Sequence, residues 1–139
     1  MTAQKKEIVL KNDITELDKL CRQIKAFGES LNIPEKSIFQ ISLALEEICT
    51  NIISYGFNDD KIHLITITVD HYCGILELRI EDDGIPFNPV EVEKPDLSRP
   101  IENRKEGGLG CYLINNLMDK VDYKREDEKN ILTVNKKIC

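Results

Sequence analysis

Residues 34–57 read PEKSIFQISLALEEICTNIISYGF, which is the pattern of a long amphipathic helix. Apolar residues recur every three or four positions along one face, at Ile38, Ile41, Leu45, Ile48 and Ile52. Pro34 suits a helix start and Gly56 a helix end, so we expect one helix here, packed on a core. Glu47 and Asn51 lie one turn apart, so their side chains share another face of the same helix.

A strand and a first helix are expected before this long helix. Residues 6–11 form a short apolar run that suits a strand. Asp13 and Glu16 match a capping box, which marks a helix start. Apolar residues at the three-and-four spacing then predict a helix up to Leu31.

A β-hairpin is expected after the long helix. Apolar and threonine residues alternate over residues 62–72, which predicts a strand. Gly74 marks a turn, and residues 75–82 suit the partner strand.

The second half of the chain combines a long loop with a helix and two strands. Four of the five prolines fall within residues 84–107, so we expect a loop there that acts as a lid over a ligand. Residues 111–118 suit a helix, and residues 121–124 and 131–138 suit strands joined by a charged turn at 125–130. The predicted fold class is α+β: a two-layer sandwich with a mixed, mostly antiparallel sheet and helices on one face.

The composition is that of one soluble globular domain. The chain has 139 residues, of which 41% are hydrophobic and 32% charged, so we expect a single domain over residues 1–139. The net charge of -6 and the scattered basic residues argue against direct nucleic-acid contact but leave room for a basic protein partner. Residues 1–10 lack the apolar run of a secretion signal or membrane span, which points to a cytoplasmic protein without membrane contact.

The cysteines and histidines indicate neither disulfides nor structural zinc. The five cysteines are odd in number and form no C-x-x-C pair, so reduced thiols are expected. His63 and His71 are not spaced with a cysteine pair in the way that zinc ligands are.

Two polar motifs could serve a nucleotide site. On the long helix, Glu47 could accept a proton from an attacking hydroxyl, and the Asn51 oxygen could bind Mg²⁺. At the end of a predicted strand, Asp82 could accept from the exocyclic amine of adenine, and Gly84 would allow a close approach of the backbone. Each motif alone also fits an ordinary surface or turn position.

A glycine-rich turn is the third candidate motif. Gly107, Gly108 and Gly110 open the predicted third helix, where backbone N–H groups and the helix dipole favour a phosphate. No Lys-Ser or Lys-Thr follows them, so the pattern is not a Walker A loop, and no strand directly precedes them as in a dinucleotide fingerprint. A tightly packed loop is the alternative interpretation.

Taken together, residues 45–51, 81–87 and 106–119 resemble the N, G1 and G2 boxes of the GHKL ATPases, which share the Bergerat fold. The run through residues 117–119 is similar to the small anti-sigma-factor serine kinases of bacteria, and the chain shares their length and element order. One difference is that residues 55–57 read Tyr-Gly-Phe, where those kinases commonly have a histidine followed by Gly-Tyr or Ala-Tyr.

This resemblance implies a cytoplasmic protein-serine/threonine kinase that uses ATP and Mg²⁺. It also implies two partners, a sigma factor and an anti-sigma-factor antagonist that is the substrate, and a homodimer. Its site residues would be the base Glu47, the metal ligand Asn51, the adenine-binding Asp82, Gly84 and Thr133, and the phosphate turn of Gly107, Gly108 and Gly110. An ATP-gated protein-interaction module without phosphotransfer is the alternative. A histidine kinase is disfavoured, because neither histidine lies on a dimerising helical hairpin.

Overall fold

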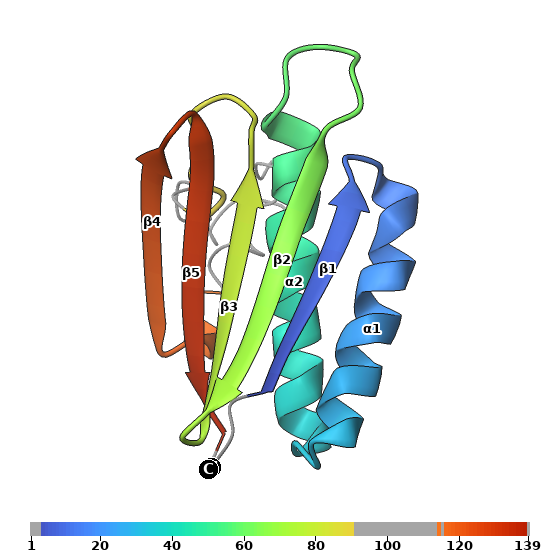
Figure 1. Ribbon diagram of the computed structural model, residues 1–139, viewed down its shortest axis with the longest axis vertical. Helices are drawn as coiled ribbons and strands as arrows, with labels where there is room; N and C mark the ends of the chain where they lie inside the picture. Colours follow the sequence, from blue (N-terminus) through green and yellow to red (C-terminus); the bar gives the residue numbers. More distant parts are fainter. Residues whose placement is uncertain (1–3, 91–113, 115, 139) are drawn as a thin grey trace, which may run out of the picture.

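The computed structural model describes residues 4–90, 114 and 116–138. The strands are β1 (Gln4–Lys11), β2 (Leu64–Tyr72), β3 (Ile75–Asp82), β4 (Lys120–Glu126) and β5 (Lys129–Lys137), and the helices are η1 (Ile14–Glu16), α1 (Leu17–Ser30) and α2 (Glu35–Tyr55). The strands form one sheet in the order β1-β2-β3-β5-β4, with every pairing antiparallel. Figure 1 shows α1 and α2 on the same face of this sheet, which confirms the α+β two-layer architecture.

The long helix α2 buries the apolar stripe that its sequence predicts. Ile41, Leu45, Ile48 and Ile52 are each at most 2% exposed, and Ile38 is 8% exposed. The sheet supplies the opposing surface, because alternate residues of β2 and β3 point into the same core. On β3, the buried row is Leu76, Leu78, Ile80 and Asp82. The core-facing row of this strand therefore ends on a carboxylate.

The first helix begins differently from the predicted capping box. The Asp13 carboxylate Oδ1 accepts from the Thr15 backbone N–H over 2.9 Å, as an N-cap does. Glu16, however, accepts from the backbone N–H of Lys11 over 2.9 Å instead of from that of Asp13. The Asp13 N–H is already used just before η1, because it donates to the carbonyl oxygen of Lys11 over 2.8 Å.

Both hairpins turn through two residues with positive φ. Cys73 and Gly74 have φ values of 49° and 73°, which confirms the predicted turn at Gly74. The second turn is shorter than the predicted turn over residues 125–130, because only Asp127 and Glu128 leave the ladder, with φ values of 52° and 63°. Strand pairing instead continues through Asn130, which is part of β5.

The predicted third helix lies mostly outside the described residues. Within them, Ile114 is buried, and its carbonyl oxygen accepts from the Met118 N–H over 3.0 Å, as in a helix. The lid expected over residues 84–107 is described only up to residue 90. Among the described residues, no helix is long and apolar enough to cross a membrane.

Candidate functional site

The end of α2 meets the turn after β3 at one end of the sheet (Figure 1). The Ile85 N–H donates to the carbonyl oxygen of Gly56 over 2.8 Å. Gly84 is pressed against the same carbonyl, since a Cβ at this position would lie 2.1 Å from the Gly56 oxygen. Only glycine permits this approach, and the turn is thereby held against the helix that carries Glu47 and Asn51.

Asp82 ends the buried row of β3 with its carboxylate held in place. It is 4% exposed, and its Oδ1 accepts from the Gly84 N–H over 2.9 Å and from Asn130 Nδ2 over 3.0 Å. Burial raises the pKa of Asp82, while these two hydrogen bonds oppose that effect. Because both bonds use Oδ1, they leave the Oδ2 atom of the carboxylate for other contacts.

Asn130 is a site residue that the sequence reasoning missed. It is 2% exposed and lies directly opposite Asp82 in the β3–β5 ladder. Its Nδ2 also donates to the Ile85 carbonyl oxygen over 2.7 Å, and its Oδ1 accepts from the Phe87 N–H over 3.1 Å and from the Tyr123 hydroxyl. One amide thus joins β3, β4, β5 and the turn that follows Asp82. The available signal was the alternation that places residues 130, 132 and 134 on one face.

Thr133 is not brought to this cluster. It pairs with Arg79 in the ladder, three residues along β5 from Asn130. Because neighbouring side chains of a strand alternate between faces, Thr133 lies on the face that the helices do not cover. The structure therefore places Asn130, and not Thr133, beside Asp82.

Asn51 and Glu47 lie on α2, one turn apart as expected. Asn51 is 2% exposed, and its Nδ2 donates to the carbonyl oxygen of Pro89 over 3.2 Å. That bond uses the amide nitrogen, whereas Mg²⁺ prefers oxygen ligands such as the oxygen of the same amide. Glu47 is half-buried, and burial, followed by the charge of Glu46, raises the pKa of its carboxyl. Glu46 itself is exposed.

The chemistry of these donors fits a magnesium nucleotide as far as the described residues extend. Asn51 carries a neutral oxygen, and Asp82 carries a carboxylate at the edge of the buried core. Gly107, Gly108 and Gly110, the expected phosphate turn, lie outside the described residues.

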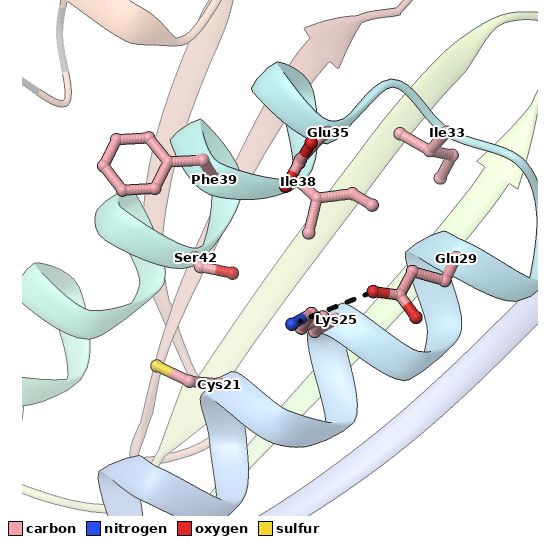
Figure 2. Close-up of a pocket in the computed structure, with 8 residues that line it drawn as sticks. All are labelled: Cys21, Lys25, Glu29, Ile33, Glu35, Ile38, Phe39 and Ser42. Atoms are coloured by element: carbon pink, nitrogen blue, oxygen red, sulfur yellow. Dashed lines mark ion pairs between the residues drawn. The ribbon is translucent and has the colours of Figure 1, made fainter.

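A separate groove lies between α1 and the first half of α2 (Figure 2). It has a volume of about 530 Å³ and is lined by Cys21, Lys25, Glu29, Ile33, Glu35, Ile38, Phe39 and Ser42. Lys25 and Glu29 form an exposed ion pair along its wall. None of the candidate nucleotide residues lines this groove.

Comparison with known proteins identifies the class of this domain as a histidine kinase-like ATPase domain. Residues 10–136 match the family of the histidine kinase-like ATPase domain, and the chain belongs to this family. The structure resembles the crystal structure of the RsbU and RsbW domains of Rv1364c from Mycobacterium tuberculosis, with a TM-score of 0.68 and 12% identity over 97% of this chain and 32% of that one. It also resembles the blue-light activated histidine kinase EL346 of Erythrobacter litoralis, with a TM-score of 0.56, 18% identity and coverage of 76% of this chain and 32% of that one.

Curated relatives in sequence are the serine-protein kinases RsbW. The chain is 34% identical over 96 residues to that of Bacillus mycoides, covering 66% of this chain and 59% of the relative. It is 32% identical over 99 residues to that of Bacillus cereus strain ATCC 10987, covering 68% and 61%. The matches thus span about 60% of the relatives' length. They confirm the resemblance to the anti-sigma-factor serine kinases of the GHKL superfamily.

Proposed function

We propose that this protein is an ATP-dependent serine/threonine kinase that binds a sigma factor and phosphorylates an anti-sigma-factor antagonist. The observation that carries the proposal is the junction of α2 with the turn after β3, where the buried carboxylate of Asp82 is followed by Gly84, a position that only glycine fits against the Gly56 carbonyl oxygen. The similarity to RsbW kinases supports the choice of substrate class and partners. A cytoplasmic homodimer is part of the same proposal.

Each residue has one role in this proposal. Asp82 accepts from the adenine amine and Gly84 brings the backbone close to the ring, while Asn130 fixes the Asp82 carboxylate. Glu47 accepts the proton of the substrate hydroxyl, and its raised pKa makes it a stronger base. Mg²⁺, with Asn51 as a protein ligand, would offset the negative charge of the phosphates. Holding the two reactants in line supplies much of the remaining rate effect.

Two variants separate binding from transfer. With radiolabelled ATP and an antagonist protein, Glu47→Ala should bind ATP in calorimetry but leave the antagonist unlabelled. Asp82→Asn should lose affinity for ATP itself. If Glu47→Ala labels the antagonist as fast as the parent, Glu47 is not the base.

An ATP-gated interaction module is the second candidate. The contact between Asn51 and Pro89 favours it, because it joins the candidate nucleotide site to the segment that leads into the expected lid. The same labelling assay distinguishes the two, since a binding module leaves every antagonist unlabelled while its affinity for a partner still depends on ATP.

A further inference from the structure

His63 is fixed at the start of β2 by both its backbone and its ring. The His63 N–H donates to Asn12 Oδ1 over 2.9 Å, and the Asn12 N–H donates to the His63 carbonyl oxygen over 3.0 Å. The imidazole stacks on Phe57, with ring centroids 4.5 Å apart and planes 16° apart, and its side chain is only 16% exposed. The ring therefore has a single well-defined place next to the end of α2.

Both ring nitrogens of His63 contact carboxylates. Nε2 lies 2.8 Å from Asp59 Oδ1, and Nδ1 lies 3.0 Å from Asp83 Oδ1. An ionised carboxylate can only accept hydrogen bonds, whereas a neutral imidazole has one donor and one acceptor nitrogen. Both contacts are favourable together only when His63 carries two N–H groups, that is, as an imidazolium ion.

The two carboxylates belong to the two segments that meet at the nucleotide site. Asp59 lies in the connection between α2 and β2, and Asp83 lies between Asp82 and Gly84. Phe57, on which the ring stacks, directly follows Gly56, whose carbonyl oxygen holds the turn after β3. The imidazolium thus links the end of the helix to the turn that carries Asp82.

We propose that His63 is a positioning residue of the nucleotide site: as an imidazolium it bridges Asp59 and Asp83 and so holds the turn of Asp82 and Gly84 against the end of α2. The proposal rests on the proposed nucleotide function. Loss of the His63 proton removes one of the two bonds, so affinity for nucleotide decreases as pH rises.

The charged groups around His63 set the direction of this effect. The hydrogen bond that the imidazole donates to Asp59 is the main cause that raises the pKa of His63; partial burial opposes this effect, and the bond to Asp83 adds to it. Lys61 donates its backbone N–H to Asp59 over 2.9 Å. His63 and Arg125 of β4 both line a cavity of about 300 Å³. The Arg125 guanidinium donates to the Gly84 carbonyl oxygen over 2.8 Å. Neither cation contacts the imidazole through a described bond. Between β1 and η1, the neutral amide of Asn12 accepts from the backbone N–H of His63.

The sign of the pH dependence follows from linkage. The pKa of His63 is higher in the folded protein than in the unfolded chain. The stability that the His63 bridge adds is therefore complete below the unfolded pKa of about 6.5 and is lost as pH rises through the folded pKa. The pKa of Asp59 is lowered, mainly by the bond to His63, so the stability that the ionised Asp59 adds is lost only in acid.

The test combines two measurements on the full chain. The chain has two histidines, so NMR titration shows two imidazole signals, and His63→Gln and His71→Gln assign them. Calorimetry with MgADP at about pH 6 and about pH 9, on either side of an ordinary histidine pKa, gives the affinity of each variant. At each pH we compare the dissociation constant of the variant with that of the parent as a ratio. Protonation of the nucleotide affects both constants equally, so its effect cancels in this ratio.

We expect the His63 signal to titrate above an ordinary histidine and to move to lower pH in Asp83→Asn. His63→Gln should weaken MgADP binding about threefold to fivefold at the lower pH, the range of partly exposed ion pairs, and much less at the higher pH. For His71→Gln, the ratio of dissociation constants should be near one at both pH values. A His63 titration unaffected by Asp83→Asn, or a His63→Gln ratio equal at both pH values, would overturn the proposal. Failure of the parent to bind MgADP would overturn the nucleotide function as well, so the two failures are distinguishable.

Discussion

Asn130 donates its Nδ2 to the Asp82 carboxylate over 3.0 Å from the position directly opposite in the β3–β5 ladder. The two residues are 48 positions apart in the chain and each is at most 4% exposed. A carboxylate that must meet a ligand at the edge of a core needs a partner that fixes its rotamer. The Asn130 amide provides that partner and also binds the turn that follows Asp82.

Asn130→Ala should therefore damage stability and binding together. The substitution removes the partner of the Ile85 carbonyl oxygen and of the Phe87 N–H, both partly buried bonds, and one of the two partners of Asp82 Oδ1. An unpaired polar group costs about 1–3 kcal/mol, so we expect a loss of about 2–4 kcal/mol in unfolding free energy. Urea denaturation measures it, and calorimetry with ATP should show weaker binding.

Asn135→Ala is the matched control for that variant. It is the same substitution on the same strand, and the Asn135 Oδ1 has no hydrogen-bond partner among the described residues. A loss of stability in Asn135→Ala equal to that in Asn130→Ala would show that the Asn130 network contributes nothing specific.

Asp82→Asn should separate stability from binding. Burial raises the folded pKa of Asp82, so the ionised group opposes folding; that cost is absent below the ordinary value of 3.8 and complete above the raised folded pKa. An amide at this position can still accept from Gly84 and Asn130 through its oxygen. At neutral pH the variant should be at least as stable as the parent, yet bind ATP about 10- to 100-fold more weakly, because a donor replaces the acceptor that adenine needs.

Denaturation at neutral and acid pH, with calorimetry, checks this. Asp122→Asn, which removes an exposed carboxylate on β4, is the charge-matched control and should change neither quantity. A destabilised Asp82→Asn would mean that the carboxylate is required by the fold.

The pattern of the chain was sufficient to predict the elements whose signal is local. The α2 stripe of Ile41, Leu45 and Ile48 and the alternation of Ile65, Ile67 and Val69 each depend on the period of one element, and these residues are buried. The strand predicted over residues 62–72 begins only at Leu64, and Ile62 and Leu64 are 73% and 54% exposed. Burial of one face is what selects such a period, so the sequence carries it directly.

Other features depend on pairings that no local pattern encodes. The turn at Asp127 and Glu128 has positive φ without the glycine that usually follows Asp or Asn in such a turn, so the predicted turn was too long. That error placed Asn130 in the turn, whereas the structure places it in β5, directly opposite Asp82. The contact of His63 with Asp83 likewise arises from the β2–β3 register and not from the spacing of the two residues.

The raised pKa of Glu47 should determine the pH dependence of the phosphotransfer rate. The base acts only when ionised, so the rate should rise with pH through its raised pKa. Glu46→Gln removes the neighbouring charge that contributes to this shift and should move the rising limb to lower pH. Glu35→Gln, at the start of the same helix, is the control and should leave the profile in place.

Glu47→Gln should reduce the rate about 10²- to 10⁴-fold, the usual contribution of a general base, without changing the affinity for ATP. If the rising limb of the pH–rate profile does not shift in Glu46→Gln, a group other than Glu47 controls that profile.

Gly84→Ala tests whether the close contact between the turn and α2 is needed for nucleotide binding. A Cβ there would lie 2.1 Å from the Gly56 carbonyl oxygen, a backbone atom that cannot rotate away, so the turn must move and the Ile85 bond to the same oxygen must lengthen. Gly28→Ala offers a contrast, because its Cβ would meet a side chain, Ile38 Cγ1 at 2.6 Å, between α1 and α2 and away from the turn of Asp82. Overpacking costs about 1–3 kcal/mol, so both variants should lose stability in urea denaturation. Only Gly84→Ala should also lose affinity for ATP, because only this glycine sets the position of Asp82; equal affinity in the two variants would show that the helix contact does not position the adenine-binding turn.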